Sequence, residues 1–199
     1  MRRLAIASVS LPLALLLAAA PVLADTGPGG SGTNFFSGSS SCATSGSRQV
    51  CTDTSLNVGP NGDGTSFGCL DVFSYAISNT GRFTFISERI GCNANVSLTV
   101  GSDYSVTFPA TDFSMQTCAA HKRQCSGSTT STVSASDTVV GDITTTTTRS
   151  TTVSGNCTTK TTSTETSANL AGSMTIDGSS LAQDGFLDIL KLSQTTRCR

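Results

Sequence analysis

The stretch that decides the fold class is NVSLTVGSDYSVTF, residues 95–108. Apolar side chains alternate with small polar ones from Val96 to Val100, and again from Tyr104 to Phe108. This period of two places the apolar side chains on one face of an extended strand. The Gly101-Ser102-Asp103 segment between the two rows is typical of a tight turn. The stretch therefore predicts a β-hairpin.

The same alternation recurs along much of the chain. The further rows are Phe67, Cys69, Phe73, Tyr75 and Ile77; Phe83 and Phe85; Phe113 and Met115; and Leu170, Met174 and Ile176. Turn signals such as Asn79-Thr80-Gly81 and Asp177-Gly178 separate the rows. Repeated strands with turns between them predict an all-β fold, and we expect an antiparallel, disulfide-bonded β-sandwich of the immunoglobulin-like type over residues 42–199.

A threonine-rich segment lies inside this predicted domain. Residues 129–168 contain 17 threonines in 40 positions. Threonine favours extended backbone through its branched β-carbon, and its hydroxyl tolerates water. We expect a solvent-facing β-hairpin here, with strands near 139–153 and 157–168 and a turn at 154–156. A disordered, O-glycosylated stalk is the alternative.

The first residues have the pattern of an export signal. Arg2 and Arg3 precede an apolar run, and small residues lead up to Ala24. This predicts a secretory signal peptide over residues 1–24, of a length typical of bacteria. The Gly- and Ser-rich residues 25–41 then predict a flexible leader, in which Phe35 and Phe36 are the exceptions.

Composition limits the classes of function. The chain has 199 residues with a formal net charge of −1. Without residues 1–24, 55 of 175 residues are apolar, and 10 basic residues face 13 acidic ones. This acidic balance argues against a nucleic-acid partner. No later segment has the apolar length of a membrane span, so we expect no span after cleavage.

All eight cysteines follow the predicted cleavage site. They are Cys42, Cys51, Cys69, Cys92, Cys118, Cys125, Cys157 and Cys198. An even number in an exported chain predicts disulfides, because the compartment is oxidising. Their spacing and the single histidine do not fit a zinc site, and we expect no metal and no cofactor. Sequential pairing is the simplest of the 105 possible connectivities.

One predicted disulfide would close a short basic loop. Between Cys118 and Cys125 the sequence places His121, Lys122 and Arg123. A disulfide that fixes this loop would lower the entropy cost of binding. The loop is therefore a candidate binding site, for example for a trypsin-like protease that the chain would inhibit; a solvated turn is the simpler interpretation.

A second motif suggests catalysis. Gly64-Thr-Ser66-Phe-Gly68 has the G-x-S-x-G spacing of a hydrolase nucleophile elbow. That motif needs a strand before the serine and a helix after it. Here a turn precedes Ser66 and a predicted strand follows it, so we assign no catalytic residue. A small serine hydrolase remains an alternative.

Together these features predict a secreted, cell-surface or periplasmic protein that is not an enzyme. We expect it to act by binding or structural support, with an unknown protein or cell-surface partner. The protease inhibitor that presents residues 118–125 is the main alternative.

Overall fold

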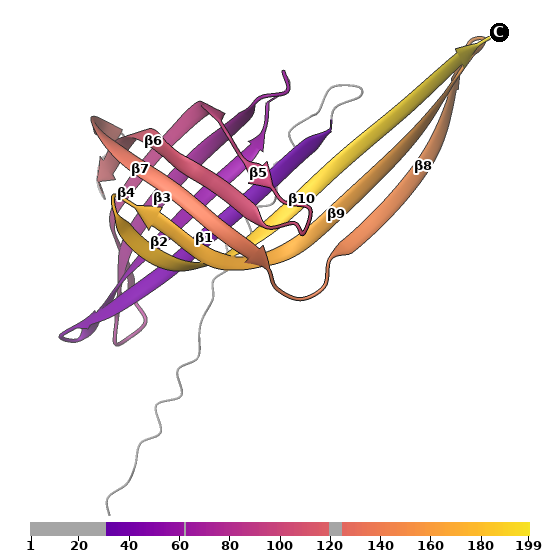
Figure 1. The fold of residues 1–199 in the computed structure, drawn as a ribbon. Coiled ribbons are helices and arrows are strands. Elements are labelled where there is room, and N and C mark those ends of the chain that lie inside the picture. Colours follow the sequence, from indigo (N-terminus) through magenta and orange to yellow (C-terminus); the bar gives the residue numbers. More distant parts are fainter. Residues whose placement is uncertain (1–30, 62, 120–124) are drawn as a thin grey trace, which may run out of the picture.

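A computed structural model of the protein describes residues 31–61, 63–119 and 125–199. These residues form ten strands joined by turns (Figure 1). The strands are β1 (Gly32–Ser45), β2 (Arg48–Pro60), β3 (Ser66–Ser78), β4 (Phe83–Val96), β5 (Thr99–Val100), β6 (Val106–Ala119), β7 (Cys125–Val139), β8 (Thr144–Ser154), β9 (Cys157–Ile176) and β10 (Ser179–Cys198). In this part of the chain no helix could span a membrane. The all-β prediction is confirmed.

The ten strands belong to one antiparallel sheet, which closes on itself. β1 pairs with β2 along one edge and with β10 along the other, and β10 also pairs with β9. Strands β1, β2, β3, β4, β6, β7, β9 and β10 therefore follow one another around a closed circuit, which we call the ring. The short β5 pairs with β6, and β8 pairs with β9.

The predicted immunoglobulin-like sandwich of two sheets is not confirmed, since all ten strands lie in one sheet. The physical reason is that opposite walls of a ring face each other across a core, as the two sheets of a sandwich do. Both arrangements require strands with one apolar row. Pairing of the first strand with the last is what distinguishes them, and alternation along a strand does not encode it.

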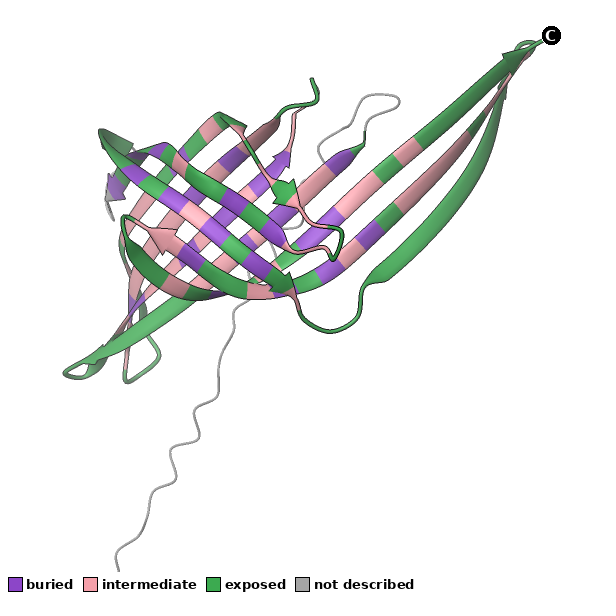
Figure 2. Cartoon of the chain, viewed as in Figure 1, coloured by how far each residue is buried: buried purple, intermediate pink, exposed green. Residues whose placement is uncertain are grey.

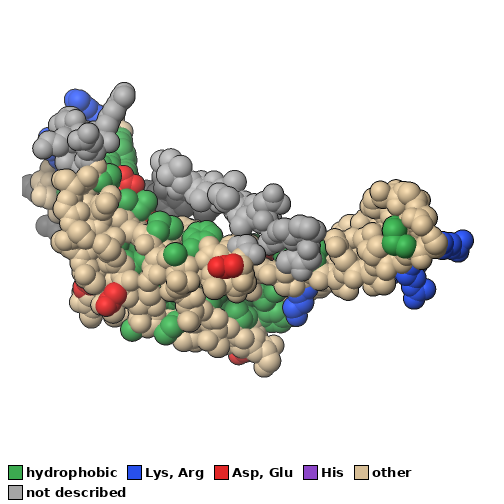
Figure 3. Space-filling model, turned by 90° about the horizontal axis from the view of Figure 1, so that it is seen from above, with side chains coloured by type: hydrophobic (Ala, Val, Ile, Leu, Met, Phe, Trp, Pro, Cys, Tyr) green, Lys and Arg blue, Asp and Glu red, His purple; other side chains and the backbone are tan. Residues whose placement is uncertain are grey.

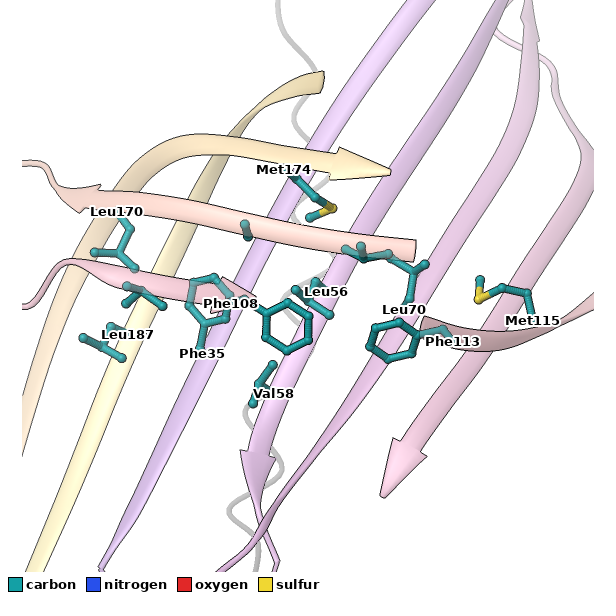
Figure 4. Close-up of a cluster of buried hydrophobic side chains, with 13 residues drawn as sticks. Phe35, Leu56, Val58, Leu70, Phe108, Phe113, Met115, Leu170, Met174 and Leu187 are labelled. Atoms are coloured by element: carbon teal, nitrogen blue, oxygen red, sulfur yellow. The ribbon is translucent and has the colours of Figure 1, made fainter. Parts of the chain in front are cut away.

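The hydrophobic core fills the inside of the ring (Figure 4). Buried and more exposed residues alternate along most ring strands, as the predicted period of two requires (Figure 2). The buried core residues are Phe35, Leu56, Val58, Leu70, Val106, Phe108, Phe113, Met115, Val133, Ala135, Leu170, Met174 and Leu187. The ring centroids of Phe108 and Phe113 lie 6.2 Å apart. The inward-facing apolar rows predicted on β6 and β9 are thus confirmed.

Two segments differ in detail from the sequence prediction. Residues 32–41, expected in a flexible leader, lie in β1, where Phe35 is buried between β2 and β10. The predicted hairpin at 95–108 has its turn at Gly101, whose N–H donates to the carbonyl of Ser105 at 2.8 Å. Its first strand, however, is reduced to the two residues of β5.

Four disulfides join the cysteines in sequential pairs, as predicted. They are Cys42–Cys51, Cys69–Cys92, Cys118–Cys125 and Cys157–Cys198. In every pair the two cysteines are direct partners on adjacent strands. The disulfides therefore link strands that are already hydrogen-bonded neighbours. Their number is consistent with an oxidising environment.

Strands β9 and β10 continue beyond the ring as a projecting arm (Figure 1). β1 pairs with β10 as far as Leu190, and β7 pairs with β9 as far as Leu170. β9 and β10 then remain paired up to Cys157 and Cys198, and β8 adds a third strand beside β9. We define the arm as residues 144–167 and 191–199.

Candidate functional site

The pairing of the arm strands determines which way each side chain points. In an antiparallel sheet, paired residues share a face, and successive residues of a strand alternate between faces. Thr162 of β9 lies between Arg149 of β8 and Ser193 of β10, so these three side chains share a face. No register shift interrupts either pairing. The face of every paired arm residue therefore follows from its position.

Four of the five cationic residues of the arm lie on the same face. Arg149 pairs with Thr162, and Lys191 pairs with Thr164, which puts both on the face of Lys160. Arg197 joins them, since it pairs with Thr158. We call this surface, defined by Arg149, Lys160, Lys191 and Arg197, the basic face. It continues the inner face of the ring, where Ala168 and Leu170 of β9 are buried.

The arm has one carboxylate side chain, and it lies on the opposite face. Glu165 pairs with Thr146 on one side and Leu190 on the other. It is offset by one residue from Thr164, so it points away from the basic face. Thus no acidic side chain of the arm opposes the four cations on their own face.

Three of these cations form a diagonal line across the arm. Arg197 on β10, Lys160 on β9 and Arg149 on β8 are each displaced by one strand and two residues from the next. With strands about 4.8 Å apart and a rise of about 6.8 Å per two residues, neighbouring Cα atoms in this line are roughly 8 Å apart. Lys191 pairs with Thr164 of β9, so it lies two residues closer to the ring than Arg149, which pairs with Thr162. All four side chains are exposed.

Protection of a free sheet edge does not explain the whole set. Cations on edge strands discourage pairing with other chains, and this could account for Arg149 on β8 and for Lys191 and Arg197 on β10, which is the other edge of the arm beyond Leu190. Lys160, however, lies on β9, the central strand of the arm, which has β8 on one side and β10 on the other. Its charge projects from the face and protects no edge.

Threonine rows and one disulfide hold the arm together. The hydroxyl oxygens of Thr145 and Thr166 lie 3.2 Å apart, and those of Thr159 and Thr196 lie 2.9 Å apart. Every residue of β8 is exposed. The arm therefore buries little apolar surface, although ordering each of its residues costs about 1–2 kcal/mol of backbone entropy.

Charge is segregated along the molecule. The ring and its turns, residues 31–143 and 168–190, contain eleven acidic and five basic residues, whereas the arm contains one acidic and five basic residues. In Figure 3 blue side chains are visible toward the far end of the arm, and the visible red ones lie over the ring. The net charge of −1 for the whole chain conceals a basic arm on an acidic ring.

An aromatic cluster lies on the outer face of the ring. Leu70 and Ala76 of β3 are buried and face the inside of the ring. Phe73 and Tyr75 belong to the alternate row of the same strand, so they face outward. Phe73 lies 6.2 Å from Phe83 and 5.2 Å from Phe85 of β4, measured between ring centroids. Phe83 is 54% exposed. The apolar rows predicted on β3 and β4 thus form, but they pack against each other outside the core.

A carboxyl group beside this cluster has a perturbed pKa. Burial, with a smaller contribution from the negative charge of Glu88, raises the pKa of Asp71 from 3.8 to about 6. Asp71 and Glu88 are diagonal neighbours on β3 and β4, since their partners are Ile90 and Phe73. Oδ1 of Asp71 is buried without a hydrogen-bond partner in the described part of the chain.

A second buried carboxyl group lies inside the ring. Asp137 of β7 is 1% exposed, and its Oδ1 accepts a hydrogen bond of 2.6 Å from Nε2 of Gln183. Burial raises the pKa of Asp137, and the hydrogen bond from Gln183 opposes this rise. Asp137 and Gln183 therefore form a polar pair within the apolar inner face of the ring, where Asp137 lies between Ala135 and Val139 of β7.

The predicted loop site is only partly described. Cys118 and Cys125 form the predicted disulfide at the ends of β6 and β7. His121, Lys122 and Arg123 lie outside the described residues. Ser66 is the first residue of β3 and pairs with Pro60 and Val96, so the helix of a nucleophile elbow does not follow it.

No metal centre is apparent within the described ranges, where no group of three or more His, Cys, Asp or Glu residues could hold an ion. The sequence reasoning missed the basic face. The sequence prediction of a three-residue turn at 154–156 would have put Arg149 and Lys160 on opposite faces; the two-residue turn Gly155-Asn156, with Ser154 paired to Cys157, puts them on one face. That Lys191 and Arg197 of β10 lie on the same face follows only from the pairing register of β9 and β10.

Comparisons of the chain with known protein families, with curated proteins and with solved structures found no match.

Proposed function

We propose that the chain is an exported, non-enzymatic binding protein whose arm binds an acidic polysaccharide along the basic face. The observation that carries this proposal is the register that gathers Arg149, Lys160, Lys191 and Arg197 on one face without an opposing carboxylate. Four disulfides and the predicted signal peptide support an extracellular or periplasmic place of action.

The shape of the basic face favours an extended ligand. The diagonal of three cations spans roughly 16 Å, if each step is about 8 Å. Like charges this close repel one another, and an anionic polymer that lies along them relieves the repulsion and releases its counterions. Threonine hydroxyls between the cations can donate to and accept from sugar hydroxyls and sulfate or carboxylate oxygens.

Other anionic partners fit this face less well. The arm has no aromatic residue, and aromatic stacking contributes much of the affinity of proteins for single-stranded nucleic acid. Its one exposed large apolar side chain among the described residues is Val153, whereas interfacial membrane binding requires a continuous apolar face. A hydroxyl-rich basic surface therefore favours a polysaccharide.

Calorimetric titration with heparin, as a model sulfated polysaccharide, at several salt concentrations tests the proposal. We expect the wild-type chain to bind heparin and not neutral dextran. Lys160→Ala should weaken heparin binding several-fold and reduce the slope of log K against log salt by about one, because one cation fewer displaces counterions.

A charge-preserving variant is the matched control. Lys160→Thr combined with Thr161→Lys moves the central cation to the opposite face and leaves the net charge unchanged. This variant should lose as much affinity as Lys160→Ala. Wild-type affinity in the exchanged variant would show that only net charge matters, and the proposal would then be wrong. Absence of heparin binding, or tighter binding of duplex DNA or anionic vesicles, would also overturn it.

A further inference from the structure

Two tight turns lie together at the end of the ring farthest from the tip of the arm (Figure 1). The first joins β1 to β2 and precedes Arg48; the second joins β3 to β4 and ends at Arg82. The N–H of Asn79 in the second turn donates to the carbonyl of Ser47 in the first at 3.1 Å. This hydrogen bond fixes the two arginine-bearing turns side by side.

The second turn has its own internal hydrogen bonds. The N–H of Ser78 donates to the carbonyl of Arg82 at 3.0 Å, and the N–H of Arg82 donates to Oγ of Ser78 at 3.0 Å. Gly81 has a φ of 78°, which favours glycine over other residues. The backbone that carries Arg82 is therefore held in one conformation.

A half-open surface depression of about 420 Å³, called the cavity below, lies beside these turns on the face of β3 that carries Ala76 and Ser78. Its lining consists of Arg48, Ala76, Ser78, Thr80, Arg82 and Thr84. Two guanidinium groups and three hydroxyl groups contribute to this lining, and no carboxylate does. The cavity thus has hydrogen-bond donors and positive charge within a strongly acidic ring.

From this arrangement we infer a second binding site, which takes a phosphate or sulfate group carried by a small molecule of about monosaccharide size. Arginine guanidinium groups match the geometry of tetrahedral oxyanions through paired N–H donors. The hydroxyls of Ser78 and Thr80 are hydrogen-bonded to each other at 2.8 Å, so one of them, together with the hydroxyl of Thr84, remains as a further donor. The cavity lies within the usual range of about 300–1,000 Å³ for small-molecule sites, and it is larger than a free oxyanion needs.

This inference does not depend on the proposed function of the arm. The cavity and the basic face share no residue, and they lie at opposite ends of the molecule. The repulsion between Arg48 and Arg82, which have no carboxylate beside them in the cavity, is a reason to expect an anion there.

Titration of the full chain followed by ¹H–¹⁵N NMR tests this site. The probes are inorganic phosphate, inorganic sulfate, glucose 6-phosphate, glucose 6-sulfate and glucose, in a buffer without other oxyanions. We expect saturable shifts of the amides of Arg48, Gly81 and Arg82 with the anionic sugars and none with glucose. Shifts with the phosphates alone would identify a phosphate site, and shifts with the sulfates alone a sulfate site.

Variants assign the binding to the two arginines. Arg48→Ala and Arg82→Ala should each weaken binding about tenfold or more, as expected for loss of a charge-assisted pair of hydrogen bonds. Arg199→Ala removes the same charge from the arm, outside the basic face, and should leave binding within about twofold of wild type. Absence of saturable shifts, or unchanged affinity in Arg48→Ala/Arg82→Ala, would show that this inference is wrong.

Discussion

At the scale of single residues, Asp71 shows how the outer face of the ring constrains ionisation. Its carboxyl group lies between β2 and β4, next to aromatic side chains and the negative charge of Glu88. A group whose pKa is higher in the folded than in the unfolded state binds a proton more tightly when folded. Ionisation of Asp71 therefore opposes folding.

The variant Asp71→Asn should be more stable than wild type at pH 7. The pKa of Asp71 is about 6 in the folded chain against an ordinary value of 3.8. Wild-type stability should therefore fall as pH rises from about 4 to about 6, and the asparagine variant should avoid this loss. If Asp71 were fully buried, this pKa difference would correspond to about 3 kcal/mol of unfolding free energy. Because the group is partly exposed to solvent, we expect Asp71→Asn to raise the unfolding free energy by about 1 kcal/mol.

Urea unfolding at pH 4 and pH 7 measures this difference. Asp63→Asn is the matched control, because hydrogen bonds from Thr65 lower the pKa of Asp63. The control variant should therefore lose stability at neutral pH. Equal stability of Asp71→Asn and wild type at pH 7 would contradict the prediction.

At the scale of elements, the arm depends on the disulfide at its far end. Cys157 and Cys198 are direct partners at one end of β9 and β10, with a sequence separation of 41. A loop of that length corresponds to roughly 4 kcal/mol in the chain-entropy account of disulfide stabilisation. The arm has little apolar burial to replace this contribution.

Replacing both Cys157 and Cys198 with Ala should therefore open the arm and leave the ring folded. Hydrogen–deuterium exchange should become about a hundredfold faster, or more, in residues 144–167 and 191–198. It should stay unchanged in ring strands such as β3. Cys69→Ala/Cys92→Ala is the control, since that disulfide joins β3 to β4 within the ring. Unchanged exchange in the arm would refute this account.

At the scale of the whole molecule, the ring closes where β10 meets β1. Residues 184–190 of β10 pair with β1 on one side and with β9 on the other. Gly185 sits within this doubly paired segment. A Cβ atom there would lie 2.8 Å from the carbonyl oxygen of Phe36 and 3.3 Å from Cβ of Leu170. The close approach of the three strands thus requires glycine.

Gly185→Val should destabilise the ring by about 2–3 kcal/mol, because the added side chain overpacks the closure. Chemical denaturation measures the loss, and hydrogen exchange in residues 32–38 should rise as β1 separates from β10. Ala182→Val places the same side chain at an exposed position of β10 that β1 does not pair with, and it should have little effect. An unchanged free energy of unfolding in Gly185→Val would show that closure tolerates a larger separation of the strands.

Sequence and structure agree on local features for physical reasons. Alternation at Val106 and Phe108 indicates one buried strand face, and the turn from Gly101 to Ser105 is held by hydrogen bonds among its own residues. The disulfides could be predicted because each joins neighbouring strands of a local pairing. Alternation does not reveal which face is the core, and on β3 the aromatic row of Phe73 and Tyr75 faces outward while Leu70 faces the core.

By itself, the sequence indicated the strands, most turns, a disulfide-bonded state and the oxidising compartment that disulfides imply, because these depend on short-range pattern and chemistry. Sequential pairing was the simplest of the possible connectivities, and the structure decided in its favour. Only the tertiary structure decided that one sheet closes through β1 and β10. It also decided that Arg149, Lys160, Lys191 and Arg197 share a face and that Arg48 and Arg82 line one cavity. Strand register and the packing of distant turns set these arrangements, and neither follows from alternation within one strand.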